Sequence, residues 1–274
     1  MRTNPSLFKR GAVPLLFFGL GWGVCGSQML DAAEEFSESF LNKHHNQAIM
    51  GVVGEARFLQ PQEQGLQVHI KPPATDNTGI RYAPHLIGDF TVTVRASLVN
   101  VPKPLEGYGT GFALLLEDGQ SHGASLQRVV FPGERHGVVA HHYTVIGGEY
   151  DHRAKETALD ATDVILQMER KGSTLIYRAS AKGTETLQEI DRVEFTSNPI
   201  VVTQVYGQPG GAANEVVVRI EGVEIKAAEL LRPGQNSKIA DKGRYLVIFA
   251  TGIAAAAVAT GLFLLRRRRT EPEV

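Results

Sequence analysis

Three carboxylates in the C-terminal half of the chain have a spacing that suits acid–base chemistry. Glu189, Asp191 and Glu194 read Glu-x-Asp-x-x-Glu, and side-chain alternation along a strand can bring such carboxylates to one face. Two carboxyl groups can serve as nucleophile and acid/base around a glycosidic bond. Arg192 stands within the motif and would neutralise adjacent carboxylates on an exposed face. We therefore favour a structural role for these acids and keep glycoside hydrolysis as the alternative function.

Histidines gather in the middle of the chain, at His136, His141, His142 and His152. Histidine is the commonest metal ligand. On a strand, however, His141 and His142 point to opposite faces, so both cannot bind one ion without distortion. We favour a solvated His-rich loop or edge over a zinc or copper site, and we assign no metal ligand.

Calcium is a second ion to weigh, because carboxylate oxygens are its usual ligands. No run of the sequence spaces acidic residues as an EF-hand loop does. Scattered aspartates can still converge in space, so Ca²⁺ stays an open alternative. The aspartates concerned are Asp76, Asp89, Asp118, Asp151, Asp160 and Asp163.

Composition excludes some classes of function. The chain of 274 residues carries 28 Lys+Arg and 29 Asp+Glu, a net charge of -1, which rules out the overall basic footprint of a nucleic-acid binder. Its single cysteine cannot form an intramolecular disulfide or a cysteine-based zinc site. The glycine-rich run Gly107–Gly111 precedes a predicted strand rather than a helix, so it is not a dinucleotide-binding loop.

Aromatic side chains indicate where a non-catalytic domain would bind a ligand. Tyrosines are enriched at binding surfaces because they combine a large apolar ring with a polar hydroxyl. We expect a glycan or a protein of the cell envelope to bind the loops around Tyr108, Tyr143, Tyr150 and Tyr206.

The N-terminus has the pattern of a secretory signal peptide. Positive charges at Arg2, Lys9 and Arg10 precede an apolar stretch that ends at Gly26. We predict a signal peptide over residues 1–26. A lipidated Cys25 and an uncleaved N-terminal anchor are the alternatives.

The C-terminus has the pattern of a membrane anchor. Residues 245–265 contain no charge, and 21 helical residues span about 31 Å, the thickness of the hydrocarbon core. Four arginines follow as a stop-transfer signal that places this end in the cytoplasm: Arg266, Arg267, Arg268 and Arg269. We predict a polar stalk over 232–244, a transmembrane helix over 245–265 and a cytoplasmic tail over 266–274. A sorting tail that is later removed is the alternative.

Between the two ends, short strands recur. Residues 90–98 alternate apolar and polar side chains, as do residues 66–70, and 112–116 are apolar throughout. A turn at Lys171–Gly172 joins two strands into a predicted hairpin. The apolar parity of the last strand switches at Gly222, which indicates a bulge or a break.

About ten such strands with Gly/Pro turns predict an all-β fold, an antiparallel β-sandwich of the jelly-roll type over residues 34–231. A single C-terminal transmembrane helix would complete the chain. An ectodomain of this size buries enough surface to fold without a disulfide.

Three motifs resemble those of concanavalin A-like lectin and glucanase sandwiches. They are Gly88–Val94 (a Gly-Asp-Phe strand), Gly107–Leu114 (a glycine-rich strand) and Met168–Tyr177 (an Arg-x-Gly-x-x-Leu-x-Tyr hairpin). The ordered set from about Phe36 to Ile225 is similar to an uncharacterised domain family of secreted planctomycete proteins. This resemblance implies the fold and an extracytoplasmic location, but no activity. Glucanases of this fold carry an apolar residue where Arg192 stands and line their sites with tryptophans, which this domain lacks after cleavage at Gly26.

The sequence therefore predicts a single-pass membrane protein with its sandwich outside the cytoplasm. We expect the sandwich to bind a carbohydrate or a protein without catalysis. A glucanase that uses Glu189, Asp191 and Glu194, and a structural scaffold of the envelope, are the alternatives.

Overall fold

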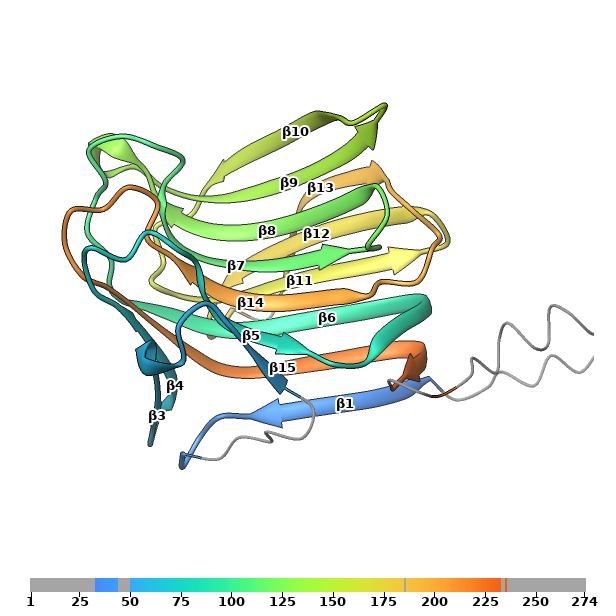
Figure 1. The fold of residues 1–274 in the computed structure, drawn as a ribbon, viewed down its shortest axis with the longest axis horizontal. Helices are drawn as coiled ribbons and strands as arrows, with labels where there is room; N and C mark the ends of the chain where they lie inside the picture. The colour runs from blue at the N-terminus through green and yellow to red at the C-terminus, as the bar shows by residue number, and fades with distance from the viewer. Residues whose placement is uncertain (1–32, 44–49, 185, 233–234, 236–274) are drawn as a thin grey trace, which may run out of the picture. The chain divides into compact units, whose positions relative to one another are not determined.

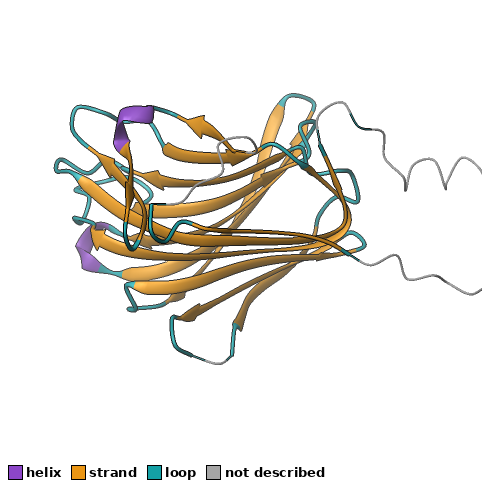
Figure 2. Ribbon diagram, turned by 90° about the horizontal axis from the view of Figure 1, so that it is seen from below, coloured by secondary structure: helices purple, strands orange, loops and turns teal. Residues whose placement is uncertain are grey.

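The computed structural model describes residues 33–43, 50–184, 186–232 and 235. These residues form two antiparallel sheets packed face to face, as Figures 1 and 2 show. The predicted all-β antiparallel sandwich is confirmed. Two short 3₁₀ turns, Ala56–Phe58 and Pro132–Glu134, are the helical segments of this part of the chain.

The larger sheet has eight strands, of which β6 and β15 are the longest and pair along most of their length. Strand β1 (Glu34–Ser39) pairs with β15 beside the main path. The other strands run in the order β13 (Gln188–Glu194), β12 (Thr174–Ala181), β11 (Asp163–Lys171), β6 (His85–Asn100), β15 (Val216–Leu231), β4 (Gly65–Ile70) and β3 (Leu59–Gln62).

The smaller sheet has seven strands, and its two edges are the exposed hairpin strand β10 and the short strand β2. Its order is β10 (Glu149–Ala158), β9 (His136–Ile146), β8 (His122–Val130), β7 (Thr110–Glu117), β14 (Val202–Gln208), β5 (Thr78–Tyr82) and β2 (Met50–Val53).

The core lies between the sheets and follows the period of two. In β6, Phe90, Val92 and Val94 are buried in the core, and in β7 the same holds for Phe112 and Leu114. Burial of such side chains supplies the main driving force for stacking the sheets. The bulge expected at Gly222 is confirmed, because the β15–β6 register shifts between Ile220 and Gly222.

Two buried arginines brace the sandwich. Arg128 donates to the carbonyl oxygens of Val129 (2.7 Å) and Ala161 (3.0 Å), and burial lowers its pKa to about 10, partly opposed by Asp160. Arg170 donates to the carbonyl oxygens of Gly88 and Thr196. Because both guanidinium groups bind main-chain carbonyls of distant segments, they act as polar cross-links within the domain.

The described part of the chain contains fifteen strands, more than the ten or so expected. One of the strands that the sequence did not indicate is β10, in which eight consecutive side chains from Glu149 to Glu156 are exposed. An edge strand exposed on both faces has no apolar alternation, so periodicity cannot reveal it.

In the described residues, no helix is long and apolar enough to cross a bilayer. The predicted signal peptide (1–26), transmembrane helix (245–265) and basic tail (266–274) lie outside the described residues, as does most of the predicted stalk (232–244).

Candidate binding face of the seven-stranded sheet

The face of the seven-stranded sheet that points away from the core carries rows of polar and aromatic side chains. In β7, Phe112, Leu114 and Leu116 belong to the core, so Leu115 and Glu117 point to the outer face. The strand register then aligns outer residues across neighbouring strands. One row reads Val202, Glu117, Gly123, Tyr143 and His152; the next reads Gln204, Leu115, Ser125, His141 and Ala154; the third reads Tyr206, Ala113, Gln127, Val139 and Glu156.

Tyr143 reaches across β8 to a carboxylate on β7. Its hydroxyl donates to Glu117 Oε1 at 2.6 Å. The glycine at position 123 makes this path available, because a Cβ there would lie 2.2 Å from the Tyr143 ring. Burial, and then the hydrogen bond to Glu117, raise the pKa of Tyr143 far above its usual value. The hydroxyl therefore stays protonated and holds the ring in one orientation.

Four aromatic rings form a platform on β9 and β10. Tyr143 and Tyr150 lie with ring centroids 5.4 Å apart, and Tyr150 stacks on His152 at 5.4 Å with an interplanar angle of 9°. His152 also stacks on His141 at 5.3 Å. Burial, and then the nearby His152 and His142, lower the pKa of His141. A platform of packed aromatic rings suits the apolar face of a flat ligand.

Amide and hydroxyl groups form the floor of the face beside the platform. Gln127 donates to Ser125 Oγ (2.9 Å), and Gln208 donates to Gln127 Oε1 (3.3 Å). The carbonyl oxygen of Gln204 accepts from Arg81, whose exposed guanidinium has no carboxylate partner among the described residues. Gln127 and Gln208 are partly exposed and offer both donors and acceptors, whereas the side chains of Ser125 and Gln204 are buried.

Tyr206 lies in the same floor but is 8% exposed. Burial raises its pKa to about 12, with a smaller contribution from the charge of Glu117. The structure therefore differs in two ways from the binding surface that the tyrosines predicted. Tyr143, Tyr150 and Tyr206 lie on strands of one sheet face rather than on loops, and Tyr108 stands apart on a loop, 92% exposed.

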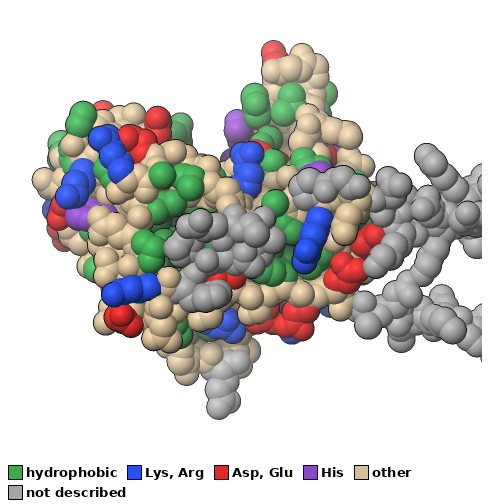
Figure 3. All heavy atoms as spheres, turned by 60° about the horizontal axis from the view of Figure 1, so that its bottom comes forward, with side chains coloured by type: hydrophobic (Ala, Val, Ile, Leu, Met, Phe, Trp, Pro, Cys, Tyr) green, Lys and Arg blue, Asp and Glu red, His purple; other side chains and the backbone are tan. Residues whose placement is uncertain are grey.

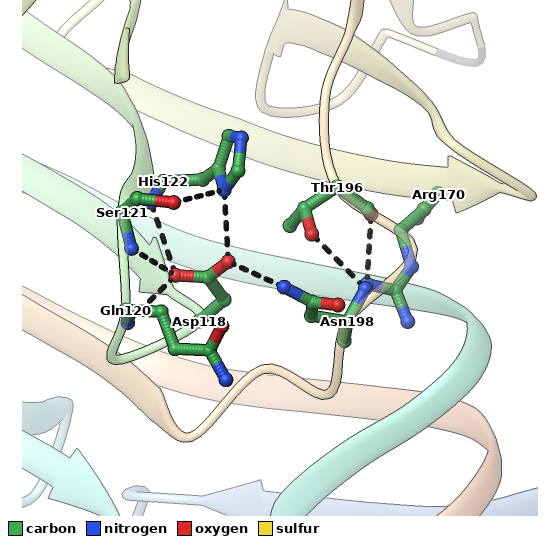
Figure 4. Close-up of polar contacts among 7 residues, drawn as sticks. All are labelled: Asp118, Gln120, Ser121, His122, Arg170, Thr196 and Asn198. Carbon is green, nitrogen blue, oxygen red and sulfur yellow. Dashed lines mark hydrogen bonds and ion pairs between the residues drawn. The ribbon is translucent and has the colours of Figure 1, made fainter. Parts of the chain in front are cut away.

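A buried aspartate anchors the turn that follows Glu117 (Figure 4). Asp118 Oδ1 accepts from the backbone N–H groups of Gln120, Ser121 and His122. Its Oδ2 accepts from Asn198 Nδ2 (3.0 Å) and contacts His122 Nδ1 (2.9 Å). Burial by itself would raise the pKa of Asp118, but these hydrogen bonds outweigh it and hold that pKa well below the usual range.

The same turn, from Gly119 to Gly123, reads Gly-x-Ser-x-Gly, the pattern of a serine-hydrolase elbow. A strand follows it rather than a helix. Ser121 Oγ and Asp118 Oδ2 both contact Nδ1 of His122, whereas a catalytic triad uses the two different ring nitrogens. The arrangement fixes a turn and does not activate a nucleophile.

The three carboxylates of the Glu-x-Asp-x-x-Glu motif lie on β13, an edge strand of the other sheet. Glu189 forms an ion pair with Arg192 (2.8 Å), and Asp191 contacts Lys155 (3.4 Å). A register shift between Tyr177 and Arg178 breaks the alternation. Asp191 stands opposite the core residue Tyr177, whereas Glu189 stands opposite Arg178 and is exposed. The register thus sets Asp191 apart from Glu189 and Glu194. Glu194 stands opposite Thr174, on the same outer side of the strand as Glu189, and is also exposed.

The candidate metal ligands are also dispersed. No group of three His, Cys, Asp or Glu side chains among the described residues could hold an ion. His136 binds Arg128, and His141 binds His152. Of the aspartates, Asp89 accepts from the backbone of Gly172, and Asp163 binds Ser97.

Two further surfaces bear on the choice of site. An apolar hollow of about 390 Å³, lined by Phe40, Met50, Leu59 and Ile80 among others, lies beside β2 and β3 and offers few polar groups. On the face shown in Figure 3, Lys and Arg side chains are scattered singly rather than gathered in a patch.

Sequence reasoning missed Glu117, Gln127, Gln204 and Gln208 as members of this face. The parity of β7, β8 and β14 would have assigned each to an outer face. Their convergence depends on β14 pairing with β7, across more than eighty intervening residues, which local patterns do not encode.

Comparisons with known proteins identify a family and a fold. Residues 27–243 match the family model described as "Protein of unknown function (DUF1583) C domain". No curated protein matches the chain. Solved structures match the fold at low identity.

Three similar structures have TM-scores just above 0.5. One is a GH43 protein, BlXynB, of Bacillus licheniformis (TM-score 0.52, 9% identity, 70% of this chain and 39% of that chain). Another is GH43B of a xyloglucan PUL of Bacteroides ovatus (0.51, 10%, 70% and 39%). The third is the CBM2 module of the evolved Dit of Lactobacillus casei BL23 phage J-1 (0.51, 9%, 71% and 96%). The chain thus spans about two fifths of the two GH43 proteins. At these identities the likeness shows the fold alone.

Proposed function

We propose that this chain, which belongs to the family of unknown function described as the DUF1583 C domain, binds a polysaccharide without cleaving it. The site is the outer face of the seven-stranded sheet. The observation that carries the proposal is the row in which Glu117 fixes Tyr143, and Tyr143 in turn packs against Tyr150 and His152.

The chemistry of this face fits a sugar chain. A pyranose presents an apolar face of C–H groups and a rim of hydroxyls. The rings of Tyr143 and Tyr150 can stack on the apolar face of the sugar. The amides of Gln127 and Gln208 can exchange hydrogen bonds with its hydroxyls. Because the rows run across the strands, several sugar units in line would contact platform and floor together.

The positions of the carboxylates favour binding over hydrolysis. Glycosidases of the usual kind need two carboxyl groups that flank the scissile bond. On this face Glu117 is bound by Tyr143, and Glu156 is paired with Arg135. The names of the structural neighbours, with GH43, xyloglucan and CBM2 among them, support carbohydrate as the ligand class.

Binding is tested with the full chain, solubilised in mild detergent, against xyloglucan, xylan, laminarin and alginate by titration calorimetry. We expect at least one polysaccharide to bind. The molecular mass of that polysaccharide should be unchanged after prolonged incubation with the protein, because the chain does not cleave it. Tyr150→Ala removes the most exposed tyrosine of the platform and should weaken that binding about tenfold, or about 1.4 kcal/mol, since tyrosines at the centre of an interface often cost more than 1 kcal/mol when truncated.

The matched control is Tyr108→Ala, which removes an exposed tyrosine outside the platform and should leave the affinity within about twofold. A well-folded chain that binds none of the four polysaccharides would overturn the proposal. Equal losses from Tyr108→Ala and Tyr150→Ala would move the site away from the sheet face.

We further propose that the domain is displayed outside the cytoplasmic membrane, anchored through residues 245–265. The support is the charge-free run and the four arginines after it. The full chain should sediment with membranes and resist extraction by alkaline carbonate. A chain ending at residue 244 should be released in soluble form, whereas its retention in the membrane fraction would contradict the C-terminal anchor.

A further inference from the structure

Strand β10 presents a long free edge at one end of the seven-stranded sheet. It pairs with β9 on one side and with no other described strand. The hairpin turn is Gly147–Gly148, with φ of 63° and 90°, and two-residue turns of this type close on a hydrogen-bonded pair, here Ile146 and Glu149. Hydrogen-bonded pairs alternate along an antiparallel ladder. The main-chain groups of Tyr150, His152, Ala154 and Glu156 therefore point away from β9.

The charges along this edge are ordered so that the strand complements itself. Glu149 and Asp151 come first, and Arg153 and Lys155 follow on the same side of the strand. Within one copy Arg153 lies 3.7 Å from Asp151 and Lys155 lies 3.4 Å from Asp191, so association exchanges these ion pairs for pairs between copies. A second β10 laid antiparallel presents the reverse order. Its basic residues would then face the acidic residues of the first copy.

The register between the two β10 strands is limited by the residues whose main-chain groups can exchange hydrogen bonds. With His152 opposite His152 of the second copy, the outward-pointing groups meet, Glu149 faces Lys155 and Asp151 faces Arg153. The adjacent allowed registers centre on Asp151 or on Arg153 and place like charges directly opposite, which is destabilising. One register thus satisfies both the hydrogen bonds and the charges.

We propose that two copies of this chain associate by antiparallel pairing of β10 with β10 about a two-fold axis at His152. The two seven-stranded sheets then form one continuous sheet. Because a two-fold axis normal to a sheet keeps like faces together, both outer faces lie on the same side of the assembly. The two platforms of Tyr143 and Tyr150 become neighbours, which suits a long polymer that contacts both.

The register is tested by disulfide formation in the full chain in a Cys25→Ser background. Residues directly opposite in a hydrogen-bonded pair have Cα atoms about 5.5 Å apart, within the range of a disulfide. We expect His152→Cys to give a covalent dimer under mild oxidation. Ala154→Cys is the matched control, since its two copies would lie about 13 Å apart along the strands and should remain monomeric.

A covalent dimer from Ala154→Cys and not from His152→Cys would overturn the register. If neither variant forms a dimer while both thiols react with maleimide, the edge is exposed but unpaired, and the proposal fails. Polysaccharide binding by the monomer can hold in either case, so this result does not decide the proposed function.

A charge exchange provides an independent test. Asp151→Arg alone places arginine opposite arginine, and Arg153→Asp alone places aspartate opposite aspartate. Each variant should lose self-association at least tenfold by sedimentation, whereas an equimolar mixture of the two restores opposite charges and should form a heterodimer. Undiminished self-association of either variant, or failure of the mixture to associate, would contradict the pairing.

Discussion

Replacing Arg170 with alanine is expected to destabilise the domain by about 4 kcal/mol, a large part of the roughly 5–15 kcal/mol that stabilises a typical domain. Arg170 is 1% exposed. Its guanidinium donates to the carbonyl oxygens of Gly88, Thr196 and Asn198, and it lies 4.7 Å from the centre of the Phe90 ring. Hydrogen bonds from a charged donor contribute about 1.5–3 kcal/mol each. Truncation leaves a cavity and buried carbonyl groups without donors.

The loss is measured as the urea midpoint of the full chain in detergent, followed by circular dichroism. Arg170→Lys should recover part of the stability, because one ammonium group cannot reach all three carbonyls. Arg95→Ala is the matched control, since its partly exposed guanidinium lies 3.8 Å from Glu224 and surface ion pairs contribute at most about 1 kcal/mol. Similar losses from Arg170→Ala and Arg95→Ala would refute the bracing role.

Several strands could be predicted from the sequence because one of their faces is buried. Residues 90–98 alternate because β6 lies at the centre of a sheet with its inner face in the core. The parity switch at Gly222 was readable for the same reason, since one extra residue reverses the faces. Strand β10 could not be predicted, because its side chains are exposed on both faces and its sequence therefore shows no alternation of apolar and polar residues.

The candidate site was predictable in its aromatic part and not in its polar part. Aromatic enrichment at binding surfaces pointed to Tyr143 and Tyr150, which lie 5.4 Å apart at their centroids. The Glu-x-Asp-x-x-Glu spacing pointed to three acids, of which a register shift sets Asp191 apart from Glu189 and Glu194. Glu117 and Gln204 carry no local signature, since their common surface arises from the pairing of β7 with β14. Which strands become neighbours is a tertiary property, and the sites of a sheet face depend on it.

Asp118 links this face to the stability of the domain, and it should make that stability depend on pH. Its carboxylate has no exposed surface, and it binds three backbone N–H groups, Asn198 and His122. In Asp118→Asn the new amide N–H₂ faces the donor group of Asn198 or the backbone N–H groups. We expect a loss of about 2 kcal/mol at pH 7, the cost of a charged hydrogen bond and an unpaired donor.

The direction of the pH dependence follows from the lowered pKa of Asp118. A carboxylate with a depressed pKa in the folded state stabilises the protein fully above the unfolded value, near 3.9. That contribution is lost as the pH falls from there toward the lower folded value. The difference between wild type and Asp118→Asn should therefore be constant from pH 7 to about pH 5 and should shrink below pH 4.

Urea midpoints of both proteins at pH 7, 5 and 3 provide the measurement. The control is Glu189→Gln, which removes an exposed carboxylate that is paired with Arg192 and should change the midpoint little at any of the three pH values. A gap between wild type and Asp118→Asn that is the same at pH 3 as at pH 7 would show that the charge of Asp118 does not hold the turn. A difference in urea midpoint that shrinks at pH 3 would show that the ionised carboxylate of Asp118 stabilises the turn after Glu117, and with it one end of the binding face.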